Sequence, residues 1–114
     1  MNILSDYQIR QLLLLEKIII RYHDNNVVFI NLINQIEALI DLLEDIDQVW
    51  YEQIKSLWFE LEVIYAMKSA NVEDGGTPYF DKKELKDIDT IFTKLQNLIE
   101  VKINLIPQNY WDQR

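Results

Sequence analysis

Apolar side chains recur every three or four residues along much of the chain, which is the period of an amphipathic α-helix. The pattern is clearest over 28–45, where the apolar positions are Phe29, Leu32, Ile33, Ile36, Leu39, Ile40 and Leu43. A second such segment spans 48–71, after the candidate N-cap Asp47, and its apolar face comprises Trp50, Ile54, Leu57, Trp58, Leu61, Ile64 and Tyr65. The pattern therefore predicts two amphipathic helices in the middle of the chain.

Capping sequences mark the starts of two further helices, one near each end of the chain. Ser5 is followed three residues later by a glutamine, and Asp81 by a glutamate, which is the spacing of a capping box. The second of these helices should stop before Pro107, because proline cannot continue a helix. These signals predict helices over 5–23 and 82–106.

The apolar positions of the two outer helices are distributed differently. In the helix over 82–106 they form one stripe, which comprises Leu85, Ile88, Phe92, Leu95, Ile99 and Ile106. In the helix over 5–23, one face carries Ile9, Leu13 and Ile20. The residues expected to point away from that face are Leu14, Leu15 and Ile18. This helix is therefore either covered on several sides or free to act as an adaptor surface or a homodimer contact.

Four amphipathic helices joined by short turns commonly pack as an up-down bundle in which the apolar stripes meet. The expected connections are the polar stretch 23–26 and the stretch 71–78, which contains glycine and proline. With only two glycines and two prolines in 114 residues, the chain lacks the turn residues of an all-β protein. We therefore predict a single all-α domain over 1–114.

Charge and hydropathy bear on the partners and the location of the protein. The longest apolar run, over 12–20, is interrupted by Glu16 and Lys17 and is shorter than the roughly 20 residues that cross a bilayer. The N-terminus lacks the basic stretch that opens a secretory signal. The net charge of -8 repels phosphate backbones. We expect a cytoplasmic protein that binds neither membranes nor nucleic acid.

Side chains that commonly carry catalysis are scarce in this sequence. His23 is the single histidine and cysteine is absent, so the usual ligand sets of zinc and di-iron sites cannot be assembled. No nucleophile elbow or phosphate-binding loop is present, since Gly75 and Gly76 stand alone among acidic residues. We therefore expect a protein that is not an enzyme and that needs no cofactor or metal.

Paired carboxylates leave one enzymatic alternative open. All-α nucleotide pyrophosphatases hold magnesium with acids spaced three residues apart on neighbouring helices. Asp41 and Glu44 have this spacing, as do Glu84 and Asp87, although the capping box also accounts for Glu84. A magnesium-dependent nucleotide hydrolase is therefore the least favoured function that we consider.

The negative charge is concentrated in one stretch of the sequence. Residues 37–62 contain eight acidic residues and one lysine, a balance of -7, whereas the flanking segments are close to neutral. Uncompensated repulsion of this kind destabilises a fold unless a partner uses it, so we expect a basic protein partner. An outward Phe59 among the carboxylates is a candidate binding anchor. The expected partner-binding residues are Glu37, Asp41, Glu44, Asp45, Asp47, Glu52, Phe59 and Glu62.

The segment over 32–66 combines a leucine-rich helix, an acidic turn and a tryptophan with a second tryptophan that is followed by Leu-Glu and Tyr-Ala. These positions are Leu32, Glu37, Leu39, Asp45, Trp50, Trp58, Leu61, Glu62, Tyr65 and Ala66. This segment resembles the centre of the small helical immunity proteins of bacterial contact-dependent growth inhibition and related polymorphic toxin systems. The resemblance implies a non-enzymatic inhibitor that binds the C-terminal toxin domain of a cognate effector. We interpret that domain as a nuclease whose basic surface the inhibitor occludes.

Overall fold

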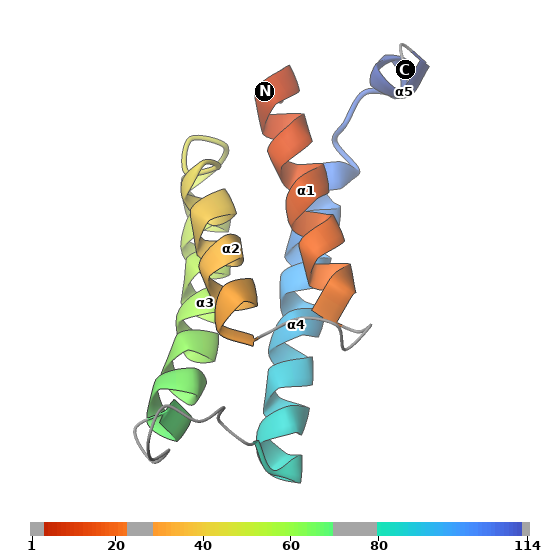
Figure 1. The fold of residues 1–114 in the computed structure, drawn as a ribbon. Coiled ribbons are helices and arrows are strands. Elements are labelled where there is room, and N and C mark those ends of the chain that lie inside the picture. Colours follow the sequence, from red (N-terminus) through yellow and green to blue (C-terminus); the bar gives the residue numbers. More distant parts are fainter. Residues whose placement is uncertain (1–3, 23–28, 70–79, 113–114) are drawn as a thin grey trace.

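The apolar periodicity of the sequence produces four long helices in the computed structural model, which describes residues 4–22, 29–69 and 80–112 (Figure 1). In chain order they are α1 (Asp6–Tyr22), α2 (Phe29–Asp41), α3 (Gln48–Ser69) and α4 (Lys82–Ile103), followed by the short α5 (Gln108–Asp112). The predicted connections at 23–26 and 71–78, which contain His23, Gly75 and Gly76, lie outside the described residues.

Both predicted capping boxes are confirmed. At the start of α1, the Ser5 N–H donates to Gln8 Oε1 at 2.9 Å, and the Gln8 N–H donates to Ser5 Oγ at 3.0 Å. At the start of α4, the Asp81 N–H donates to Glu84 Oε1 at 2.9 Å, and the Glu84 N–H donates to Asp81 Oδ1 at 2.8 Å. Each box satisfies backbone donors that the first helical turn leaves without a partner, and so fixes where the helix begins.

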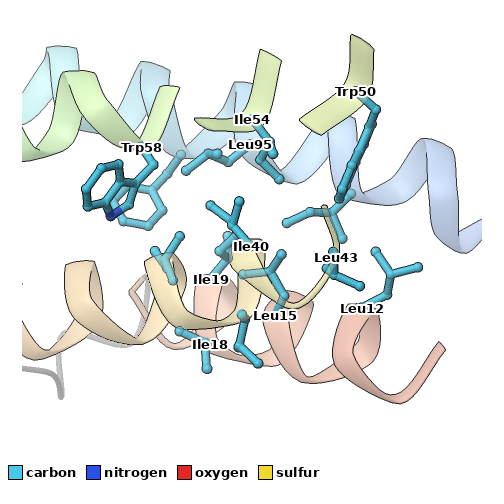
Figure 2. Close-up of a cluster of buried hydrophobic side chains, with 14 of the residues drawn as sticks. Leu12, Leu15, Ile18, Ile19, Ile40, Leu43, Trp50, Ile54, Trp58 and Leu95 are labelled. Atoms are coloured by element: carbon cyan, nitrogen blue, oxygen red, sulfur yellow. The ribbon is translucent and has the colours of Figure 1, made fainter. Parts of the chain in front are cut away.

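The four long helices pack as an up-down bundle, which confirms the predicted all-α class. α1 and α3 each contact both α2 and α4, so the helices form a ring of four neighbouring pairs (Figure 1). Figure 2 shows side chains from all four helices, among them Leu15, Ile40, Ile54 and Leu95, converging on one apolar core. No polar or charged residue is buried in the part of the chain that the structure describes. None of its helices is long and apolar enough to cross a membrane.

Two tryptophans connect α3 to its neighbours from within this core. The Trp58 indole N–H donates to the Ile33 carbonyl of α2 at 3.0 Å, and the Trp50 indole N–H donates to the Leu98 carbonyl of α4 at 2.8 Å. A buried indole N–H without an acceptor is costly, so these two bonds favour one longitudinal position of α3 against both helices.

The predicted faces of α1 are partly wrong. The buried residues of α1 are Ile9, Leu12, Leu15, Ile18 and Ile19, whereas Leu14 and Ile20 are 46% and 45% exposed. α1 is apolar at most positions, so its two neighbours α2 and α4, and not its own periodicity, determine which side is buried. Of the three residues predicted to face a partner or a second copy, Leu14 alone is available at the surface.

The ends of α4 also differ from the prediction. Leu85 is 45% exposed instead of buried, because the first turns of α4 extend beyond the end of α1 (Figure 1). α4 ends at Ile103, and a turn over 104–106 follows it, although Ile106 remains in the core as predicted. Pro107 then precedes α5, an element that the sequence analysis did not predict, because proline suits the position just before a helix as well as the end of one.

α2 ends four residues earlier than predicted. Residues 42–45 form a turn in which the Leu43 N–H donates to the Ile40 carbonyl at 2.9 Å. This hydrogen bond spans three residues, whereas those of an α-helix span four. The turn keeps Leu43 in the core and leaves the side chains of Glu44 and Asp45 exposed. Both carboxylates therefore sit at one end of the bundle.

Candidate functional site

The carboxylates predicted to bind a partner lie along α2, the turn after it and α3. In chain order they are Glu37, Asp41, Glu44, Asp45, Asp47, Glu52 and Glu62. All seven side chains are exposed or half-buried. They are not equivalent, because two lysines hold some of them in place.

Lys55 of α3 pairs with the two carboxylates of α2. Its Nζ lies 2.7 Å from Asp41 Oδ1 and 3.8 Å from Glu37 Oε2. The Tyr51 hydroxyl also donates to Asp41 Oδ1, at 3.1 Å. The hydrogen bond from Lys55 holds the pKa of Asp41 below its usual value. The Lys55 ammonium also lies 4.9 Å from the centre of the Trp58 ring, so this lysine links α2 and α3 and neutralises part of the acidic surface.

Asp47 has two structural contacts. Its Oδ1 accepts the Trp50 N–H at 3.2 Å, which confirms the predicted N-cap of α3, and its Oδ2 lies 3.0 Å from Lys102 Nζ of α4. The hydrogen bond from Lys102 lowers the pKa of Asp47. Asp47 therefore joins the start of α3 to the end of α4, with little charge left for a partner.

Four of the predicted carboxylates, which we call the unpaired acids, are Glu44, Asp45, Glu52 and Glu62. No lysine or arginine among the described residues lies within ion-pairing distance of them. Glu52 accepts a hydrogen bond from the Gln48 amide at 2.8 Å, which orients its carboxylate but does not neutralise it. Within the described part of the chain, these four carboxylates therefore have no cationic side chain to balance them.

Phe59 is exposed on α3, as predicted, between Glu52 and Glu62 in the sequence. Its side chain is 57% exposed on the side of α3 away from the core, and Val63, one helical turn later, is exposed on the same side. An aromatic ring in this position can provide apolar contact area within a charged surface.

A groove between α3 and α4 was not predicted from the sequence. Its α4 side includes Lys94, Leu98 and Val101, none of which was assigned to a site. A signal was nevertheless present in α3, whose exposed apolar residues outside the core stripe are Val49, Phe59, Val63 and Met67. These residues make α3 apolar on two sides, a property that the sequence analysis assigned to the first helix alone.

One carboxylate of each pair considered for magnesium has another partner in the structure. Asp41 is bonded to Lys55 and Tyr51, and Glu84 completes the capping box and lies 2.8 Å from Lys68 Nζ. Within residues 4–22, 29–69 and 80–112, no three His, Cys, Asp or Glu side chains are grouped so that they could hold a metal ion.

Comparison with protein-family models, curated proteins and solved structures finds no significant match to this chain. The surface chemistry and the resemblance of the segment over 32–66 are therefore the basis for a functional proposal.

Proposed function

We propose that the chain is an immunity protein that binds and neutralises the C-terminal toxin domain of a cognate contact-dependent inhibition effector. The observation that carries the proposal is the group of unpaired acids Glu44, Asp45, Glu52 and Glu62 on α3 and the turn before it. The resemblance of the segment over 32–66 to immunity proteins supplies the biological role. The negative charge of the unpaired acids favours a partner with a basic protein surface.

Electrostatic repulsion explains why a basic partner suits this surface. Like charges that have no counter-charge destabilise the folded chain, and a cationic surface placed against them removes that cost. Fields of this kind mainly accelerate association and select the partner, whereas desolvated apolar contacts slow dissociation. The unpaired acids would therefore steer the encounter, and exposed apolar residues such as Phe59 would hold the complex together.

The proposed mechanism is occlusion. A toxin that cleaves nucleic acid needs a basic surface to hold the phosphate backbone of its substrate. An acidic protein bound to that surface blocks the substrate by charge and by volume, without any chemical step. This mechanism requires no cofactor, metal or catalytic residue in the inhibitor.

Association kinetics with two charge variants test the role of the unpaired acids. The binding partner is the C-terminal domain encoded by the neighbouring upstream reading frame. Glu44→Gln combined with Asp45→Asn should lower the association rate constant about three- to tenfold at low salt. The matched control, Glu16→Gln with Glu100→Gln, changes the net charge equally on α1 and α4 and should leave the rate constant nearly unchanged.

We leave Glu37 and Asp41 intact in this test, because their substitution would also break the link through Lys55. Equal association rate constants for the two variants would remove the unpaired acids from the mechanism. A wild-type chain that does not bind the effector domain would refute the proposed function itself.

A further inference from the structure

The groove between α3 and α4 lies between two ion pairs that join these helices. Lys102 Nζ is 3.0 Å from Asp47 Oδ2 at the start of α3, and Lys68 Nζ is 2.8 Å from Glu84 Oε1 near its end. Between them, no further ion pair joins α3 to α4 in the described part of the chain. On the other side of α3, by contrast, Lys55 in the first half of this helix bridges to the end of α2.

The half of the groove nearer the start of α3 is a hollow of about 670 Å³. The half-buried Leu57 and Leu98 line it, together with the polar side chains of Gln53, Ser56 and Asn97. Val49 of α3 and Val101 of α4 stand exposed at its edges. An apolar side chain of a partner could contact Leu57 and Leu98 here.

The other half is a hollow of about 490 Å³, which adjoins the first at Lys94. Ile64 of α3 and Ile91 of α4 line it, and the exposed Phe59 and Val63 border it. From Val49 to Val63, α3 rises about 21 Å, which is the length of roughly four turns of a second helix. A helix with apolar residues at spacings of three and four would reach both hollows.

The charge of the residues around the groove indicates what kind of helix could bind there. Among the described residues that line the groove, the charged ones are the acids Glu52, Glu60 and Asp87 and one cation, Lys94. None of these four has an ion-pair partner among the described residues. A second copy of this chain would bring the same net negative charge against the groove, whereas a helix with lysine or arginine beside its apolar face would be complementary.

We propose that this groove binds an amphipathic helix of a basic partner protein, with apolar residues in the two hollows and cationic residues beside Glu52, Glu60 and Asp87. The inference rests on the proposed function for the identity of the partner, which would contribute this helix from its toxin domain. The groove would then provide the apolar contact area, and the unpaired acids at the α2–α3 turn would steer the approach.

A pair of synthetic peptides tests the groove directly. The first is a 16-residue helical peptide, about one groove in length, with leucines at spacings of three and four and lysines on the flanking positions. The second has the same leucines but glutamates in place of the lysines. Titration of the full chain, monitored by amide chemical shifts, should show binding of the lysine peptide at least about tenfold tighter than that of the glutamate peptide. The shift changes should be confined to α3 and α4.

Surface variants distinguish binding of the peptide in the groove from nonspecific binding elsewhere on the protein. Phe59→Ala combined with Val63→Ala removes exposed side chains, leaves the core intact and should weaken binding of the lysine peptide by about tenfold or more. The matched control, Leu14→Ala with Ile20→Ala, removes apolar side chains of similar exposure from α1 and should change binding by less than about twofold.

Three results would overturn the inference: equal binding of the two peptides, binding that the Phe59 and Val63 substitutions leave unchanged, or shift changes centred on α1 and α2. Sedimentation of the chain as a dimer that these substitutions dissociate would show that a second copy covers the groove, which also overturns it. Failure of this inference alone is recognisable, because the groove variant would bind the effector domain as the wild type does, while Glu44→Gln with Asp45→Asn would still slow association. Failure of the proposed function alone is also distinct, since the lysine peptide would bind while the effector domain did not.

Discussion

Two adjacent aromatic residues of α3 test which face of this helix is buried in the core and which is exposed. Trp58 is 6% exposed, lies in the core and donates its indole N–H to the Ile33 carbonyl at 3.0 Å. Phe59 is the next residue, about 100° further round the helix, and is 57% exposed. Replacing each with alanine removes an aromatic ring from the same helix at nearly the same place in the chain.

The expected cost differs several-fold between the two positions. Loss of a buried tryptophan ring lowers the free energy of unfolding by about 3–5 kcal/mol, because the transfer free energy of the ring is lost and a cavity is left behind. The indole hydrogen bond is about 1 kcal/mol of that cost, so Trp58→Phe should cost roughly 1–2 kcal/mol. Phe59→Ala should change the free energy of unfolding by less than about 0.5 kcal/mol, since it leaves no cavity.

Urea unfolding followed by far-ultraviolet circular dichroism measures these differences without relying on tryptophan fluorescence. For a chain of this length, about 1 kcal/mol corresponds to a shift of roughly 4 °C in the thermal midpoint, which gives a second measurement. Similar losses of stability for Trp58→Ala and Phe59→Ala would refute the assignment of the two faces of α3.

Three further predictions concern the stability of the bundle. Lys55→Met should lower the free energy of unfolding by about 1 kcal/mol at pH 7, through loss of its ion pairs and its contact with Trp58. Because Lys55 lowers the pKa of Asp41, this difference should be present above the unfolded carboxyl pKa and should shrink as the pH falls below about 4, as urea titrations at several pH values would show. Ser5→Ala should cost about 1 kcal/mol through loss of the N-cap of α1, measured by thermal unfolding. Leu15→Asp should abolish the cooperative unfolding transition, whereas Leu14→Asp should leave it close to that of the wild type.

The middle of the bundle was predictable because polar residues interrupt the apolar ones in α2 and α3. Along α2 and the turn after it, the six core positions from Leu32 to Leu43 stand out against asparagine, glutamine and glutamate, so a single face satisfies the pattern. In α1, four consecutive leucines over 12–15 satisfy several faces equally well. The choice of Leu12 and Leu15 depends on contacts with α2 and α4, which are distant in sequence.

The acidic surface was only partly predictable for a similar reason. The excess of carboxylates over 37–62 is visible in the sequence, but the pairing of Asp41 with Lys55 joins two helices. The pairing of Asp47 with Lys102 spans 55 positions of the chain. Counting charges along a segment of the sequence could not predict either contact or the α4 side of the groove, because tertiary packing brings these residues together.

Calorimetric titration against the C-terminal domain encoded by the neighbouring upstream reading frame, at low and at high salt, tests the central claim most directly. The account predicts a complex with a dissociation constant of about 1 nM at low salt, corresponding to roughly -12 kcal/mol, that weakens as salt screens the unpaired acids. Tight binding that salt leaves unchanged would contradict the electrostatic part of the account. No measurable binding at either salt concentration would contradict the claim that this chain is the inhibitor of that domain.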